Sequence, residues 1–147
     1  MKRVLVLCTG NACRSQMAEG YLNFFAGEKA LFYSAGLEDH GLNALAVEVM
    51  AEDNIDISDS RSKHYRVFKS LGFDFLITVC DEVNSQLPRN IRADRHLHFS
   101  IPDPAKVQGS PEQRLEAFRG VREKVKKHML RFIGTELIGS AEAPMLA

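Results

Sequence analysis

The sequence predicts a single α/β domain: a three-layer arrangement in which a four-stranded parallel sheet carries helices on both faces. Apolar runs typical of buried strands alternate along the chain with stretches whose apolar residues recur every three or four positions. A chain of 147 residues is also long enough to enclose one sizeable core. We expect a single catalytic domain over residues 1–134 and a flexible C-terminal tail over 135–147, where small residues predominate.

The first half of the chain predicts two strands and two helices. Residues 3–7 form an apolar run typical of a buried strand, and a helix is expected from Ser15 to about residue 26. A second strand is expected over 31–34, and Asn43 is a suitable N-cap for a helix that ends near residue 52. The residues of the first helix expected in the core are Met17, Tyr21, Leu22, Phe24 and Phe25.

The second half predicts two more strands and a long final helix. This last helix starts with a capping box at Ser110 and Gln113 and carries apolar residues at helical spacing as far as Phe132. The other expected elements, in chain order, are a polar loop over 55–64, a short helix over 65–71, a strand over 73–79, a short helix after Asp81 and a strand over 97–99.

Charge and cysteine content narrow the range of functions. The chain has 19 basic and 19 acidic residues, so no overall field attracts nucleic acid or a membrane, and we expect neither as a partner. The sequence shows no signal peptide and no apolar stretch of membrane-spanning length, so we expect a cytoplasmic protein. Its three cysteines should then be thiols, and their spacing to histidines predicts no metal site.

The run from Cys8 to Ser15 lies where the first strand gives way to the first helix, and it predicts an oxyanion-binding loop. Amide N–H groups at a helix N-terminus attract anions, Gly10 permits a tight backbone path, and Asn11 tolerates a left-handed conformation. Arg14 offers a planar fork to two oxygens of a tetrahedral anion, and the same positive environment favours the thiolate of Cys8. The loop residues expected to bind the anion are Thr9, Gly10, Asn11, Ala12, Cys13 and Arg14.

Two further residues follow strands and should reach the same edge of the sheet. Cys80 ends the third strand, where it is either a second reactive thiol or a small buried hydrophobic residue. Asp103 stands between two prolines, where it is either a general acid or a turn former. Cys13 is either a packing residue or a partner for Cys8 under oxidation.

From about Lys2 to Phe132 the chain resembles the low-molecular-weight protein tyrosine phosphatases, and within that fold the thioredoxin-coupled arsenate reductases. The strongest resemblance runs from Cys8 to Gly20. Gln16 stands where the phosphatases usually have proline, Ala105 replaces their aromatic residue after Asp-Pro, and Cys80 is the reductase signature. Supporting motifs are Ser34-Ala35-Gly36, His40-Gly41-Leu42-Asn43, Ile55-Asp56-Ile57-Ser58, Thr78-Val79-Cys80 and Asp103-Pro104-Ala105.

The resemblance implies an arsenate reductase that serves arsenic detoxification. Cys8 attacks arsenate, Arg14 and the loop stabilise the charge, Ser15 supports the thiolate, and Asp103 protonates the departing oxygen. Cys80 then attacks Cys8, arsenite leaves, and a Cys8–Cys80 disulfide remains. The enzyme implied is a monomer without a bound cofactor, and an external thiol restores it.

Two departures from the family pattern bear on this expectation. The third cysteine of the thioredoxin-coupled enzymes is replaced by Leu87, so the reductant is thioredoxin, glutaredoxin or a small thiol such as glutathione. Some family members bind potassium near the loop; Asn11, Glu19 and Ser34 match its ligands, whereas Arg61 and Lys63 replace two others.

Two other functions stay open from the sequence. One is a low-molecular-weight protein tyrosine phosphatase that hydrolyses phosphate monoesters through a cysteinyl-phosphate. The other is an oxyanion-binding or redox-sensing module without turnover.

Overall fold

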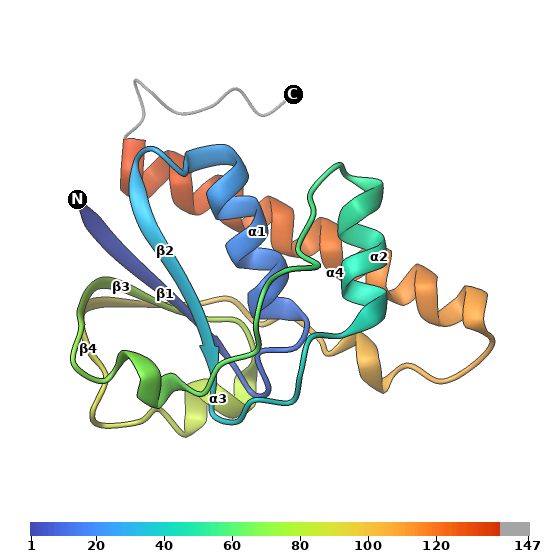
Figure 1. The fold of residues 1–147 in the computed structure, drawn as a ribbon, viewed down its shortest axis with the longest axis horizontal. Helices are drawn as coiled ribbons and strands as arrows, with labels where there is room; N and C mark the ends of the chain where they lie inside the picture. The colour runs from blue at the N-terminus through green and yellow to red at the C-terminus, as the bar shows by residue number, and fades with distance from the viewer. Residues whose placement is uncertain (139–147) are drawn as a thin grey trace.

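The computed structural model describes residues 1–138, which form a four-stranded parallel sheet in the order β2-β1-β3-β4 (Figure 1). The strands are β1 (Lys2–Cys8), β2 (Ala30–Gly36), β3 (Gly72–Thr78) and β4 (Arg92–His98). The helices are α1 (Arg14–Ala26), α2 (Ala44–Glu52), α3 (Asp81–Ser85) and α4 (Pro111–Phe132). Short helical elements are η1 (Tyr65–Phe68), η2 (Pro104–Lys106) and η3 (Ile133–Ile138).

The strand order places a topological switch at the end of β1. The chain leaves β1 for β2 on one side and later returns to β3 on the other. Cys8, the last residue of β1, is in register with Gly36, the last residue of β2. In parallel sheets of this kind the crevice at the carboxyl ends of the strands binds ligands. The loops that follow β1, β3 and β4 all leave from this edge, as the sequence predicted.

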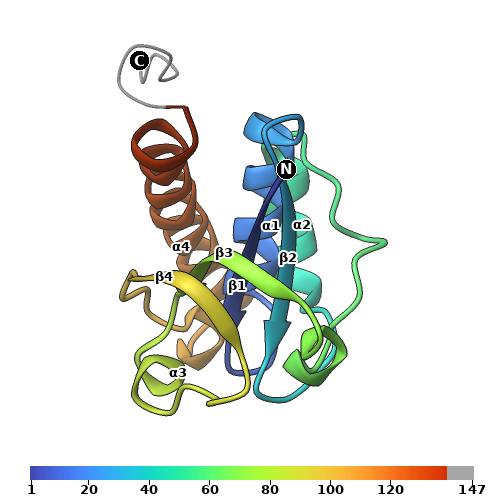
Figure 2. The same cartoon turned by 90° about the vertical axis from the view of Figure 1, so that its left-hand side faces the viewer.

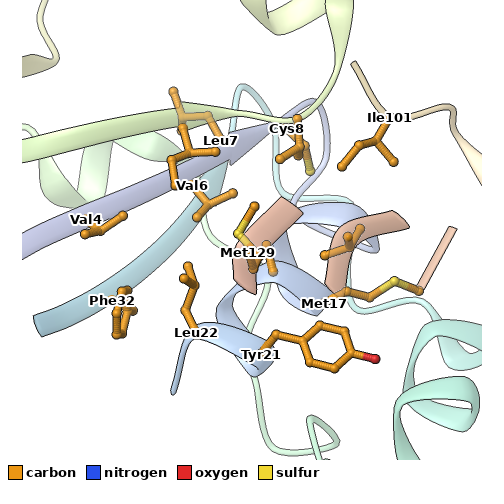
Figure 3. Close-up of a cluster of buried hydrophobic side chains, with 14 of the residues drawn as sticks. Val4, Val6, Leu7, Cys8, Met17, Tyr21, Leu22, Phe32, Ile101 and Met129 are labelled. Carbon is orange, nitrogen blue, oxygen red and sulfur yellow. The ribbon is translucent and has the colours of Figure 1, made fainter. Parts of the chain in front are cut away.

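The core lies between the sheet and the long helices. Val4, Val6 and Leu7 of β1 are completely buried, and Figure 3 shows them in one cluster with Leu22 of α1 and Met129 of α4. Burying an apolar side chain of this size stabilises the fold by about 1.5–3 kcal/mol. The apolar residues of β1 therefore hold the strand firmly in the core, and this fixes its carboxyl end, where the next loop begins.

The two faces of the sheet are covered unequally. Figures 1 and 2 show the long helices α1, α2 and α4 grouped on one side of the strands, where α4 packs against both others. On the other face Tyr33, next to inward-facing Phe32, contacts Phe68 of η1 with ring centroids 5.1 Å apart. The short helix α3 contacts β1 and β3. The expected three layers are present, although the second helical layer is thin.

Two details of the sequence prediction are wrong. The fourth strand spans Arg92–His98 rather than 97–99, because an edge strand can carry exposed charged residues that hide the apolar alternation. Phe24 and Phe25, expected in the core, are 61% and 37% exposed. They lie on the outer side of α1 and pack against each other edge to face, with ring centroids 5.0 Å apart.

Helix α4 starts with the expected capping box at Ser110 and Gln113, and a π-helical turn over Ile133–Ile138 follows it. Leu137 packs against the core, and Glu136 pairs with Arg95 of β4 at 2.7 Å. The rest of the expected tail, residues 139–147, lies outside the described residues.

No helix within residues 1–138 is long and apolar enough to cross a membrane.

Candidate oxyanion site

The backbone of the loop after β1 turns its carbonyl groups outward. The carbonyl oxygens of Cys8, Thr9, Gly10 and Ala12 accept hydrogen bonds from backbone N–H groups of residues 37–43, at 2.9–3.2 Å. The N–H groups of residues 9–13 donate no backbone hydrogen bond within the described chain. They are therefore available to an anion, and the N-terminus of α1 adds its dipole to the same place.

Asn11 fixes the shape of this loop through every polar atom of its side chain. It has a positive φ of 47°, which asparagine tolerates better than most residues. Its amide nitrogen donates to Ser15 at 2.8 Å and to Ser34 at 3.0 Å. Its amide oxygen accepts from Gln16 at 2.9 Å and from the backbone N–H of Lys63 at 2.8 Å. A fully satisfied buried amide of this kind makes the loop rigid.

Ser15 lies against the sulfur of Cys8, with 2.8 Å between its Oγ and the Sγ. Because the Ser15 oxygen already accepts from Asn11, its hydrogen is free to point at the sulfur. The Ser15 hydroxyl thus offers a hydrogen-bond donor to the Cys8 sulfur. Cys8 is buried where β1 meets the loop.

Arg14 connects the loop to the segment that follows β4. Its Nη1 donates to the carbonyl oxygen of Ile101 at 2.9 Å, and its Nη2 lies 3.8 Å from Oδ2 of Asp103. Asp103 is partly exposed, and its other oxygen accepts from the N–H of Ala105 at 2.9 Å. The guanidinium is thus held in one orientation, and the carboxyl group faces the same space.

Cys80 lies beside the loop and is completely buried. Its Sγ is 3.4 Å from the hydroxyl oxygen of Thr9, the residue that follows Cys8. Burial raises the pKa of the Cys80 thiol, and the hydrogen bond with Thr9 opposes that change. Burial, together with the negative charge of Cys8, also raises the pKa of Cys13. Both residues are therefore thiols at neutral pH in this structure.

Cys8, Arg14 and Asp103 line a cavity of about 520 Å³ at the carboxyl edge of the sheet. The anion-binding loop forms its base, residues 40–43 form one wall, and Asp103, Ala105 and Lys106 form the opposite wall. Glu82 of α3 also lines it. A cavity with convergent N–H groups, one arginine and one thiol suits a small tetrahedral anion and covalent chemistry at sulfur.

Comparison with known proteins identifies the family. A family model described as low molecular weight phosphotyrosine protein phosphatase matches residues 3–140. The chain belongs to this family. An arsenate reductase from Shouchella clausii is 38% identical over 134 residues, which cover 91% of this chain and 96% of that protein.

Solved structures of the family agree with the fold. An arsenate reductase in the phosphate-binding state matches with a TM-score of 0.77 at 34% identity, covering 90% of this chain and 97% of that one. A low molecular weight protein tyrosine phosphatase from T. tengcongensis matches with a TM-score of 0.74 at 29% identity, covering 90% and 98%. The resemblance inferred from the motifs is confirmed.

Lys63 and Glu19 occupy the region where some family members were expected to bind potassium. The ammonium group of Lys63 donates to the carbonyl oxygen of Arg61 at 2.6 Å. Burial lowers the pKa of Lys63, and the nearby charge of Glu19 opposes that change. The same Arg61 oxygen accepts from the side chain of Gln16 at 2.8 Å, and Gln16 in turn contacts Asn11. Within residues 1–138, no group of three or more His, Cys, Asp or Glu residues is arranged to hold a metal ion.

Sequence reasoning missed several contributors to this family site. It did not anticipate the Thr9 contact to Cys80 or the place of Glu82 and Lys106 in the cavity wall, because neither follows from spacing along the chain. The sequence offers only a weak indication that Gln16 belongs to the site. Gln16 is a buried polar residue within α1, so its side chain needs hydrogen-bond partners, and it donates to both Asn11 and Arg61.

Gly36 makes a close backbone approach to the anion-binding loop. A Cβ atom there would lie 2.4 Å from the carbonyl oxygen of Glu38 and 2.7 Å from the nitrogen of Asn11, and neither backbone atom can move away alone. We expect Gly36→Ala to lower the free energy of unfolding by about 1–3 kcal/mol and to weaken phosphate binding. Thermal unfolding and phosphate titration measure the two effects.

Gly120 provides the matched control for this substitution. It lies inside α4, and nothing stands within 4 Å of the position that its Cβ would occupy. Gly120→Ala should leave phosphate binding unchanged and raise stability by up to about 1 kcal/mol. Equal melting temperatures for Gly36→Ala and the unchanged protein would contradict the close contact at Gly36.

Proposed function

We propose that this protein is an arsenate reductase. The observation that carries the proposal is the Cys80 thiol, held 3.4 Å from Thr9 immediately beside the loop that encloses Cys8. Hydrolysis of a phosphate ester needs the nucleophile, the anion-binding loop and an acid, but it does not need a second thiol. Similarity to arsenate reductases over most of the chain supports the same choice.

In the first step, arsenate binds in the loop as a phosphate-like tetrahedral anion. The Cys8 thiolate attacks arsenic, and an arsenic–oxygen bond breaks as the new sulfur–arsenic bond forms. Arg14 and the loop N–H groups stabilise the charge on the remaining oxygens. Asp103, which shares the cavity with Arg14, donates the proton that lets the departing oxygen leave as water.

In the second step, the Cys80 thiol gives its proton to an oxygen of the arsenic group as its sulfur attacks the Cys8 sulfur. The sulfur–arsenic bond breaks, its electron pair stays with arsenic, and arsenic(V) becomes arsenic(III) as arsenite leaves. The two sulfur atoms are oxidised together to a Cys8–Cys80 disulfide. Thr9 holds the Cys80 thiol next to the residue that carries the target sulfur.

An external thiol must then reduce the disulfide. Thioredoxin, glutaredoxin and a small thiol such as glutathione remain the candidates, because Leu87 replaces the cysteine that would pass the disulfide outward. All three reductants belong to a reducing compartment, so we propose that the enzyme acts in the cytoplasm.

A single-turnover thiol count tests the proposal. Fully reduced protein is mixed with arsenate without an external reductant, and thiols are titrated while disulfides are mapped by mass spectrometry. We expect two thiols per chain to disappear, one Cys8–Cys80 disulfide to form and one arsenite to be released. An unchanged thiol count with no arsenite would contradict the proposal.

Phosphate ester hydrolysis is the second candidate, because the cavity brings Cys8, Arg14 and Asp103 together as that reaction also requires. Ala105 lines the wall where the phosphatases usually carry an aromatic residue, so an aryl group has less to pack against. A slow rate with an aryl phosphate, alongside fast arsenate reduction, is the pattern that we expect.

A further inference from the structure

Two histidines of β4, the exposed His96 and the partly exposed His98, form a hydrogen-bonded cluster around a buried threonine of β3. The hydroxyl oxygen of Thr78, which is completely buried, lies 2.9 Å from Nε2 of His96 and 2.7 Å from Nδ1 of His98. On its other side, Nε2 of His98 lies 2.8 Å from Oδ1 of Asp81. Ser100 donates to the second oxygen of Asp81 at 3.1 Å. The anion-binding site described above uses none of these contacts.

One arrangement of donors and acceptors links Asp81, His98, Thr78 and His96 in a chain when His98 is neutral. The Thr78 hydroxyl also lies 3.4 Å from Oδ1 of Asn84. Hydrogen bonds from His98 and Ser100 hold the pKa of Asp81 below its usual range, so this residue is a carboxylate and only accepts. His98 therefore donates from Nε2, and its Nδ1 accepts from the Thr78 hydroxyl. The Thr78 oxygen in turn accepts from Nε2 of His96.

The cluster includes residues on both sides of Cys80 in the sequence. Thr78 precedes Cys80 by two residues and Asp81 follows it directly, so one imidazole ring contacts both flanks of the cysteine. Asp81 is also the first residue of α3, and Ser100 belongs to the segment that leads to Asp103. Cys80 is therefore held by side chains that do not touch the anion.

We propose that His98 is a positioning residue for Cys80, which holds the thiol in line for its attack on the Cys8 sulfur. This inference rests on the proposed function, because it concerns the second thiol of that reaction. A nucleophile that is misplaced by about 1 Å can lose a hundredfold in rate. Because the ring touches neither the anion-binding loop nor Cys8, its loss should affect disulfide formation and spare anion binding.

The test compares His98→Ala with His98→Gln. We expect His98→Ala to slow formation of the Cys8–Cys80 disulfide by about tenfold or more, while the affinity for inorganic phosphate changes less than twofold. His98→Gln keeps an N–H donor that reaches Asp81 and should recover most of the rate. Rapid quenching with an alkylating agent, followed by mass spectrometry, measures the disulfide, and calorimetry measures phosphate binding.

Disulfide formation is started in two separate ways, so that failure of the proposed function can be recognised. Arsenate starts it through the proposed reaction. Hydrogen peroxide starts it without arsenate: the Cys8 thiolate is oxidised to a sulfenic acid, and the Cys80 thiol then attacks that sulfur, so that a disulfide forms and the sulfenic oxygen leaves as water. An unchanged protein that forms the disulfide only with peroxide would refute arsenate reduction, and the His98 comparison would still be read from the peroxide reaction.

Asp94→Asn on the same strand is the control, because Asp94 is exposed and lies near the opposite end of β4 from His98. It should form the disulfide at the unchanged rate. The positioning role is refuted if His98→Ala forms the disulfide at the unchanged rate or faster. It is also refuted if the phosphate affinity of His98→Ala falls by as large a factor as its rate of disulfide formation, or if His98→Gln is as slow as His98→Ala.

Discussion

Cys8→Ser is expected to abolish arsenate reduction and any phosphate ester hydrolysis, lowering both rates by at least about a thousandfold. A serine hydroxyl stays protonated at neutral pH, and its oxygen cannot pass through the sulfur–arsenic adduct that reduction requires. The substitution removes the nucleophile but keeps a group that can hydrogen bond with Ser15. Steady-state assays with arsenate and with an aryl phosphate measure the two losses.

Phosphate binding by Cys8→Ser shows whether the substitution removes only the reaction or also damages the anion-binding site. The loop N–H groups and Arg14 stay in place, so Cys8→Ser should still bind inorganic phosphate and should melt within a few degrees of the unchanged protein. If either activity stayed above a tenth of its original rate, Cys8 would not be the nucleophile.

The anion-binding loop could be predicted from the sequence because the residues that form it follow one another along the chain. A strand that ends at Cys8, a glycine and asparagine in the turn and an arginine at the start of a helix are all visible along the chain. The sequence also predicted that this loop, Cys80 and Asp103 lie at the same edge of the sheet, because parallel strands present their carboxyl ends at one edge.

The contacts between distant side chains could not be predicted in the same way. Lys63 donates its backbone N–H to Asn11 across 52 positions, and no pattern in one sequence announces such a pair. His98 looked like an ordinary polar residue of an exposed strand, since strand β4 hides its alternation under charged side chains. Its role becomes visible only when the register between β3 and β4 places it opposite Thr78.

Cys80→Ser should separate the two reactions that the fold can support. We expect reduction of arsenate to arsenite to fall by at least about a hundredfold, because no second sulfur can attack Cys8 and so leave the electron pair of the sulfur–arsenic bond on arsenic. Hydrolysis of an aryl phosphate should change less than about threefold, since water replaces the second thiol in that reaction. Arsenite release and phenol release from the same preparation measure both, so each sample carries its own control for folding.

The structure gives a reason to expect this separation. The Cys80 sulfur lies within hydrogen-bond distance of the Thr9 hydroxyl, and a serine at position 80 can keep a hydrogen bond there while the loop keeps its shape. Unchanged arsenite release from Cys80→Ser would mean that an external thiol attacks the Cys8 adduct directly. The buried thiol beside the loop would then be a packing residue, and the cavity over Cys8 would have to admit the reductant during every turnover.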